Sequence, residues 1–176
     1  MTAIAHSELT VAQRFLTWLG ESTGQKYTIK GRPNPPDFLL SIDEKESWLE
    51  LSDIYLNNAQ AKFLNRSNEK VFRFSGSPDE TALRMFNKLN EKVSKLSYRN
   101  VFEKLGPGIL LLTCQDIVFD SVNLSRMEEG LHSFAPFGDR GFFARAYFEY
   151  LIDGQRFYRV VYPSDEALAS VPFLQP

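Results

Sequence analysis

Hydrophobic residues at helical spacing predict a helix from Glu8 to Leu19 near the start of the chain, with Ser7 as its N-cap. Gly20 and Gly24 are expected to end this helix, because glycine is favoured just beyond a helix C-terminus. A short strand is then expected over Tyr27–Lys30. The apolar stripe of the helix consists of Ala12, Phe15, Leu16 and Leu19.

The proline-rich segment 31–36 is expected to lie outside helices and central strands, which do not tolerate it. The two apolar runs that follow it, joined by a short polar link, predict a β-hairpin. The runs are Asp37–Ile42 and Ser47–Tyr55, and the polar residues Asp43–Glu46 form the link between them. A long helix is predicted over 77–98, with serine at its N-cap, proline at its first position and acids in its first turn. Its expected buried face consists of Leu83, Phe86, Leu89, Val93 and Leu96.

The remainder of the chain is predicted to be mostly β-structure. The continuous apolar run Ile109–Cys114 follows a break at Gly106–Gly108 and is typical of a strand that is buried on both faces. A short helix is predicted over Leu124–Phe134. The segment Phe143–Tyr162 is predicted to form a hairpin that turns at Asp153-Gly154. This order of elements predicts a mixed α/β fold.

The length of 176 residues corresponds to a single domain, with a core over about 8–115 and C-terminal additions over about 116–176. Lys and Arg total 20 against 22 Asp and Glu, so the net charge is −2. That balance excludes a protein that coats DNA through bulk positive charge, and it gives no support for binding to an anionic membrane.

The few cysteines and histidines exclude several kinds of site. The single cysteine, Cys114, excludes an internal disulfide, and with only His6 and His132 a zinc site of several thiolates or imidazoles is excluded. His132 and Cys114 are interpreted as structural residues. The chain start is not typical of a signal peptide, and no apolar run could span a bilayer, so a cytoplasmic protein is expected.

Two acids lie inside the predicted hairpin, where acidic residues are disfavoured. If the four-residue link pairs Ile42 with Ser47, then Asp37, Glu50 and Ser52 lie on one face of the hairpin, and the two acids are diagonal neighbours about 7 Å apart. Two carboxylates at that range can hold Mg²⁺ together with water and substrate phosphate. A link one residue longer or shorter would separate the acids onto opposite faces. A solvated hairpin face is the alternative interpretation.

Pro36-Asp37 followed by Glu50 in a hydrophobic strand resembles the PD-(D/E)xK superfamily, the restriction-endonuclease-like nucleases. The expected order of helix, hairpin, long helix and apolar strand resembles that family over about residues 8–114. The resemblance implies a restriction-endonuclease-like mixed sheet with an αβββαβ-type core, here followed by a C-terminal β-hairpin. It also implies that Asp37 and Glu50 are catalytic and bind Mg²⁺ or Mn²⁺, and that the substrate is nucleic acid, DNA in the first place.

The chain departs from the family pattern at Ser52, because the family has a lysine two residues after the strand glutamate. Serine cannot supply the positive charge that stabilises a developing anion. Some branches of the superfamily supply this lysine from elsewhere in the fold. Lys62 is the preferred candidate here, and Lys88 and Lys92 on the long helix are alternatives that are otherwise expected to be solvated.

Glu8 is a further candidate for the site, because it continues the line of the apolar stripe towards the start of the first helix. Many members of the superfamily carry a glutamate of the first helix that reaches the metal. The alternative is an acid that is favoured by the N-terminal end of the helix dipole.

Basic residues gather in segment 84–104, which carries six Lys and Arg against two Glu, a local charge of +4. Lys88, Lys92 and Lys95 share a helical face that could contact nucleic-acid phosphates, with an ordinary solvated helix face as the alternative. The C-terminal hairpin mixes arginines with aromatic residues, which suits base stacking, a homodimer interface or plain core packing.

We therefore expect a metal-dependent nuclease-like domain that hydrolyses phosphodiester bonds. The alternatives are a relative that kept the fold but lost cleavage and serves as a binding module, and an unrelated α+β domain. In the unrelated domain, the side chains of Asp37 and Glu50 have no reason to share one face of the sheet.

Overall fold

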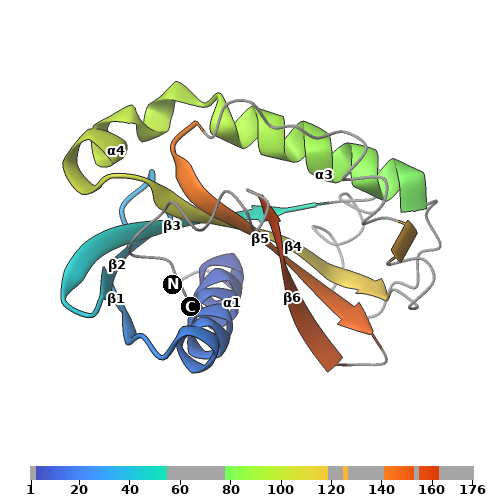
Figure 1. Ribbon diagram of the computed structural model, residues 1–176, viewed down its shortest axis with the longest axis horizontal. Helices are drawn as coiled ribbons and strands as arrows, with labels where there is room; N and C mark the ends of the chain where they lie inside the picture. The colour runs from blue at the N-terminus through green and yellow to red at the C-terminus, as the bar shows by residue number, and fades with distance from the viewer. Residues whose placement is uncertain (1–2, 55–77, 119–124, 127–140, 153–154, 163–176) are drawn as a thin grey trace.

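In the part of the chain that the structure describes, six strands form one mixed sheet in the order β1-β2-β3-β4-β5-β6 (Figure 1). The structure is a computed structural model that describes residues 3–54, 78–118, 125–126, 141–152 and 155–162. The strands are β1 (Tyr27–Gly31), β2 (Phe38–Ile42), β3 (Lys45–Asp53), β4 (Gly108–Val118), β5 (Phe143–Ile152) and β6 (Gln155–Tyr162). β1, β2 and β3 form an antiparallel meander, β4 and β5 each run parallel to the preceding strand, and β6 pairs antiparallel with β5. The mixed α/β class is confirmed.

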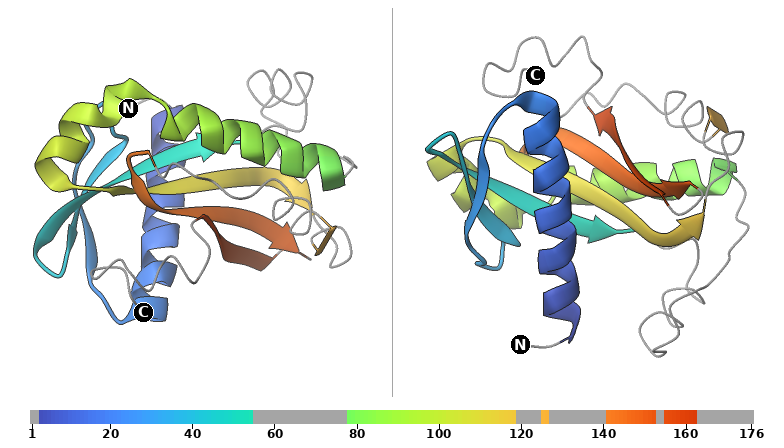
Figure 2. Two further views of the ribbon diagram at one scale, coloured as in Figure 1. Left: turned by 45° about the horizontal axis from the view of Figure 1, so that its top comes forward. Right: turned by 90° about the horizontal axis from the view of Figure 1, so that it is seen from below.

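Helices cover both faces of the sheet. α1 (Ala3–Thr23) crosses one face, and α3 (Pro78–Val93), η1 (Leu96–Tyr98) and α4 (Arg99–Leu105) lie on the other (Figure 2). α1 begins before its predicted start, so the expected N-cap lies inside the helix. Gly20 also lies inside it, and the chain leaves the helix at Gly24, whose φ of +70° suits glycine. α3 ends at Val93, earlier than predicted, because the chain turns through η1 before it continues into α4.

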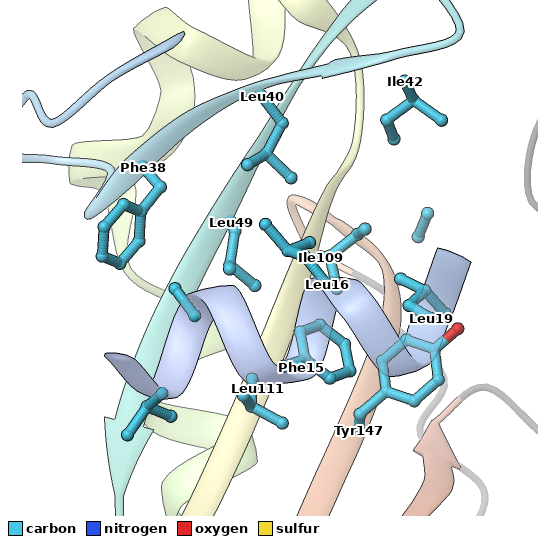
Figure 3. Packing of buried hydrophobic residues seen from close by; sticks show 13 residues of the cluster. Phe15, Leu16, Leu19, Phe38, Leu40, Ile42, Leu49, Ile109, Leu111 and Tyr147 are labelled. Carbon is cyan, nitrogen blue, oxygen red and sulfur yellow. The ribbon is translucent and has the colours of Figure 1, made fainter. Parts of the chain in front are cut away.

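The face of the sheet under α1 carries one hydrophobic cluster, and the predicted stripe of the first helix is confirmed. Phe15, Leu16 and Leu19 of α1 point towards the centre of the sheet, as Figure 3 shows. There they pack against residues of β2 to β5, including Leu49, Ile109, Leu111 and Tyr147 (Figure 3). The predicted central strand fits this position, since β4 has Ile109–Leu112 fully buried between the two layers.

The face of the sheet under α3 carries a second hydrophobic cluster. The helix face that packs there is rotated about the axis of α3 relative to the predicted buried face, so that prediction is wrong. Leu83 is 45% exposed and Leu96 is 66% exposed, whereas Leu89 is buried as predicted. The side chains of α3 that are buried are Ala82, Met85, Leu89 and Lys92, a stripe with helical spacing. The apolar contacts of the cluster therefore come from one side of α3, and Lys92 continues that side into the sheet.

The turn between β2 and β3 is shorter than predicted, and it changes the strand register. Asp43 and Glu44 both have positive φ, which is typical of a two-residue type I′ hairpin turn. Ile42 therefore pairs with Lys45 rather than with Ser47, and Phe38 pairs with Leu49. The shift is an even number of residues, so every side chain keeps its predicted face.

The C-terminal hairpin is confirmed as β5 and β6, and its aromatic residues serve core packing on β5. Glu149 of β5 is 1% exposed at its side chain and connects the hairpin to α1. Its carboxylate accepts hydrogen bonds from Arg14 of α1 at 2.7 and 3.2 Å, from Arg156 at 2.9 Å and from the Tyr158 hydroxyl at 2.7 Å. These buried charges are paired and hydrogen-bonded, which explains how an acid is tolerated inside the sheet.

Gly108, the first residue of β4, lies against the ring of Trp48 so closely that a Cβ atom there would approach the ring atoms to 2.3 Å. We therefore expect Gly108→Ala to destabilise the fold by about 1–3 kcal/mol through overpacking. Gly31→Ala is the matched control, since its Cβ would meet Leu39 at an ordinary 3.9 Å. Urea unfolding of both variants tests this, and equal midpoints for the two would contradict the close contact.

Several predictions fall outside the described residues. They concern Lys62, His132, most of the helix over Leu124–Phe134, and the turn at Asp153-Gly154. None of the helices in the described residues is long and apolar enough to cross a membrane.

Candidate active site

Asp37 lies immediately before β2, at the end of the proline-rich segment, and it is held against β3. Its Oδ2 atom accepts a hydrogen bond from the backbone N–H of Leu51 at 2.8 Å. The pairing of Phe38 with Leu49, continued by one residue, brings Asp37 opposite Glu50. The two acids are thus direct neighbours, closer than the diagonal arrangement that the predicted register gave.

Glu50 lies in the middle of β3 on the face covered by α3, and it is 5% exposed. This burial rules out a solvated hairpin face at Glu50. Its Oε1 atom accepts two hydrogen bonds, one from the Nζ of Lys92 at 2.8 Å and one from the hydroxyl of Tyr98 at 2.6 Å. Its Oε2 atom is buried, and no hydrogen-bond donor among the described residues reaches it. A buried, donor-free carboxylate oxygen is costly unless a cation approaches it.

Lys92 enters the site from the last turn of α3. It is 8% exposed, its ammonium forms the ion pair with Glu50, and it also donates to the Tyr98 hydroxyl at 3.3 Å. The helix directs it inward because it continues the stripe of Met85 and Leu89. A lysine therefore stands next to the strand glutamate, although the position two residues after that glutamate is the buried Ser52.

Tyr98, the last residue of η1, is fully buried beneath the site. Its ring stacks on Trp48 at a centroid distance of 5.5 Å and packs edge-on against Phe143 at 5.3 Å. Burial and the hydrogen bond to the Glu50 carboxylate raise the pKa of Tyr98 above the ordinary range of tyrosine. Its hydroxyl therefore stays protonated and donates to Glu50 at neutral pH.

Glu8, in the first turns of α1, is linked to the site by the effect of its charge on Asp37. Its Oε2 forms an ion pair with Arg32 at 2.7 Å, and both side chains are partly exposed. Arg32 also lies 4.8 Å above the ring of Phe38. Glu50 and Lys92 are thus buried, whereas the ion pair of Glu8 and Arg32 is partly exposed.

The electrostatic environment couples three of the acids. Burial and then the charge of Glu50 raise the pKa of Asp37 to about 6, and the charge of Glu8 adds to the rise. The backbone N–H of Leu51 and the charge of Lys92 oppose it. A partly buried carboxylate whose pKa is raised by neighbouring negative charge favours the binding of a cation.

The arrangement fits a divalent metal held by two carboxylates. Asp37 and Glu50 stand side by side, and the donor-free Oε2 of Glu50 is the oxygen that a metal would satisfy. Among the described residues no group of three or more His, Cys, Asp or Glu side chains could hold a metal. Two carboxylates are a donor set that Mg²⁺ commonly takes, with several waters completing its coordination.

The predicted site residues divide into three groups. Asp37, Glu50 and Glu8 are brought into one electrostatic neighbourhood. Lys62 lies outside the described residues. Of the three lysines predicted for nucleic acid, Lys92 points inward, whereas Lys88 pairs with Glu91 at 2.8 Å and Lys95 lies 5.5 Å above the Tyr98 ring. The prediction that they share one solvent-facing helix face is wrong for Lys92.

Tyr98 and Arg32 were not anticipated. Lys92 would have been predicted to point inward if the buried face of the helix had been assigned to the stripe of Met85 and Leu89. The contacts of Tyr98 and Arg32 come from residues distant in the chain, Glu50 and Glu8, so no local pattern announces them.

No family model, no curated protein and no solved structure matches this chain. Its function is therefore inferred from its own residues.

Proposed function

We propose that this chain is a metal-dependent nuclease-like hydrolase of the PD-(D/E)xK type, and that it cleaves phosphodiester bonds in nucleic acid, with DNA as the first substrate to test. The observation that carries the proposal is the buried pair of Asp37 and Glu50 with a lysine ammonium 2.8 Å from Glu50. The order of elements supports it, because a helix, a β-meander, a helix and a parallel strand follow each other as expected for a restriction-endonuclease-like core.

Each residue of the site has a role in the proposed reaction. Asp37 and Glu50 would hold Mg²⁺ or Mn²⁺, and the charge of Glu8 would add to the negative potential around Asp37. When bound, such a metal polarises the scissile phosphate and lowers the pKa of a water molecule. Lys92 would place positive charge where the phosphate becomes more negative, and its buried position makes that charge effective. Lys92 thus replaces Lys62 as our candidate for the lysine that Ser52 cannot supply.

The second candidate function is a nuclease-fold binding module that no longer cleaves. Ser52 favours this binding module, because serine carries no positive charge at the position where the family has a lysine. The inward position of Lys92 favours cleavage, since the site still contains an ammonium next to the strand glutamate.

Incubation of the protein with supercoiled plasmid, single-stranded DNA or RNA, in about 10 mM Mg²⁺ or Mn²⁺, tests the proposal. We expect metal-dependent cleavage that EDTA stops and that Glu50→Gln lowers by at least about 100-fold. Glu46→Gln is the matched control, since it makes the same change at an exposed acid of the same strand and should leave cleavage unchanged. Absence of cleavage of all three substrates, or equal cleavage by Glu50→Gln, would reject a hydrolase at this site.

A further inference from the structure

Tyr98 makes a contact with Glu50 that the proposed reaction does not account for. Its hydroxyl donates to the same oxygen, Oε1, that receives the ammonium of Lys92. Both donors therefore act on one oxygen of the carboxylate, and within the described part of the chain the other oxygen, Oε2, receives no donor. A carboxylate held in this way has one occupied and one available oxygen.

The tyrosine ring is fixed on several sides, which makes its hydroxyl a rigid donor. Trp48 stacks on one face of the ring at 5.5 Å, and the edges of Phe143 and Phe142 approach at 5.3 and 6.4 Å. Trp48 is itself held by a hydrogen bond from its Nε1 to the carbonyl of Gly106 at 2.9 Å. An aromatic cluster, in which Trp48, Tyr98 and Phe143 are buried, thus holds one hydroxyl 2.6 Å from Glu50.

Lysine alone would hold Glu50 less rigidly. An ammonium on a flexible four-carbon stem is a point charge that can approach either oxygen of a carboxylate, whereas a phenol on a packed ring donates in one direction. Hydrogen bonds to a ligating carboxylate from a second layer of residues commonly set its orientation and tune metal affinity.

We propose that Tyr98 is a positioning residue, which holds Oε1 of Glu50 so that Oε2 faces the divalent cation of the site. This rests on the proposed function only in that a cation binds at Asp37 and Glu50. It does not require that the protein cleaves nucleic acid. Tyr98 touches neither substrate nor metal in this role and acts through Glu50.

Tyr98→Phe tests the role, because phenylalanine keeps the ring contacts and removes only the hydroxyl. Mn²⁺ affinity is measured by calorimetric titration of the folded full chain for the wild type, Tyr98→Phe and Tyr147→Phe. We expect Tyr98→Phe to weaken Mn²⁺ binding by about 10-fold, the lower end of what loss of such a hydrogen bond costs. If the wild type cleaves DNA, the Mg²⁺ concentration for half-maximal cleavage should rise by the same factor.

Tyr147→Phe is the matched control. Tyr147 is equally buried, but its hydroxyl accepts from Arg145 on the face of the sheet under α1. Its loss should lower stability without changing Mn²⁺ affinity. Equal Mn²⁺ affinity of Tyr98→Phe and the wild type would overturn the positioning role and leave the proposed function intact. Absence of Mn²⁺ binding by the wild type would overturn both, whereas Mn²⁺ binding without cleavage would reject only the hydrolase.

Discussion

Lys92→Met is expected to destabilise the protein by about 3 kcal/mol in the absence of metal. The substitution removes the ammonium from a buried ion pair, and the Tyr98 hydroxyl is then the one partner of the Glu50 carboxylate that the described residues supply. Breaking a buried pair from one side is costly because the remaining charge stays desolvated. Urea unfolding in EDTA measures this loss as a lower midpoint at unchanged slope.

Lys88→Met supplies the matched comparison, since Lys88 lies one turn earlier and pairs with Glu91 at the surface. It should cost less than about 0.5 kcal/mol. The double variant Lys92→Met/Glu50→Gln should recover part of the loss, because it buries no unpaired charge. A loss for Lys92→Met no larger than for Lys88→Met would mean that Lys92 does not point into the site.

Lys92→Met should bind Mn²⁺ more tightly than the wild type does. The ammonium next to Glu50 repels an incoming cation, so its removal should tighten Mn²⁺ binding while cleavage is lost. Opposite changes in metal affinity and in cleavage would assign Lys92 to the phosphate rather than to the metal. Weaker Mn²⁺ binding by Lys92→Met would contradict that assignment.

Asp37→Asn is expected to stabilise the metal-free protein at neutral pH by about 2 kcal/mol. Burial and the charge of Glu50 raise the pKa of Asp37 from 3.8 to about 6. Because the folded state then binds the proton more tightly than the unfolded state, stability falls as pH rises from about 4 to about 6 and stays reduced above that range. The shift corresponds to about 3 kcal/mol, which the partial exposure of Asp37 reduces.

The measurement is the free energy of unfolding of the wild type and of Asp37→Asn between pH 4 and pH 8 in EDTA. Asparagine can still accept the hydrogen bond from the backbone N–H of Leu51, so the variant isolates the charge. The gain should vanish at pH 4, where Asp37 is protonated in the folded state. Glu46→Gln, an exposed acid of the same hairpin, should show no such trend. A variant that is less stable than the wild type at pH 7 would contradict the raised pKa.

The fold followed from the sequence where local patterns carry the signal. Helical spacing predicts the stripe of Phe15, Leu16 and Leu19, and a continuous apolar run predicts β4. The turn residues of the C-terminal segment predict its hairpin. The register of the β2–β3 hairpin could not be predicted, because an Asp-Glu turn without glycine gives no clear sign of a two-residue type I′ turn. The predicted pairing of Asp37 and Glu50 on one face survived because the error was an even number of residues.

The candidate site was predictable in its acids and less so in its lysine. Asp37 and Glu50 stand out as acids next to or within apolar runs of the sequence, which is a local property. The inward direction of Lys92 depends on which of two similar stripes of α3 faces the sheet, and packing against β3 and β4 decides that. Tyr98 lies beyond the end of α3 and meets Glu50 only through the tertiary fold, so no local pattern predicts it.

A calorimetric titration of Mn²⁺ into the metal-free protein tests the central claim most directly, namely that Asp37 and Glu50 hold one divalent cation. We expect one Mn²⁺ per chain at submillimolar concentration in the wild type, and at least about 10-fold weaker binding in both Asp37→Asn and Glu50→Gln. Lys88→Met should bind as the wild type does. Absence of metal-dependent heat in the wild type at millimolar Mn²⁺, or binding that survives in Glu50→Gln, would contradict the site.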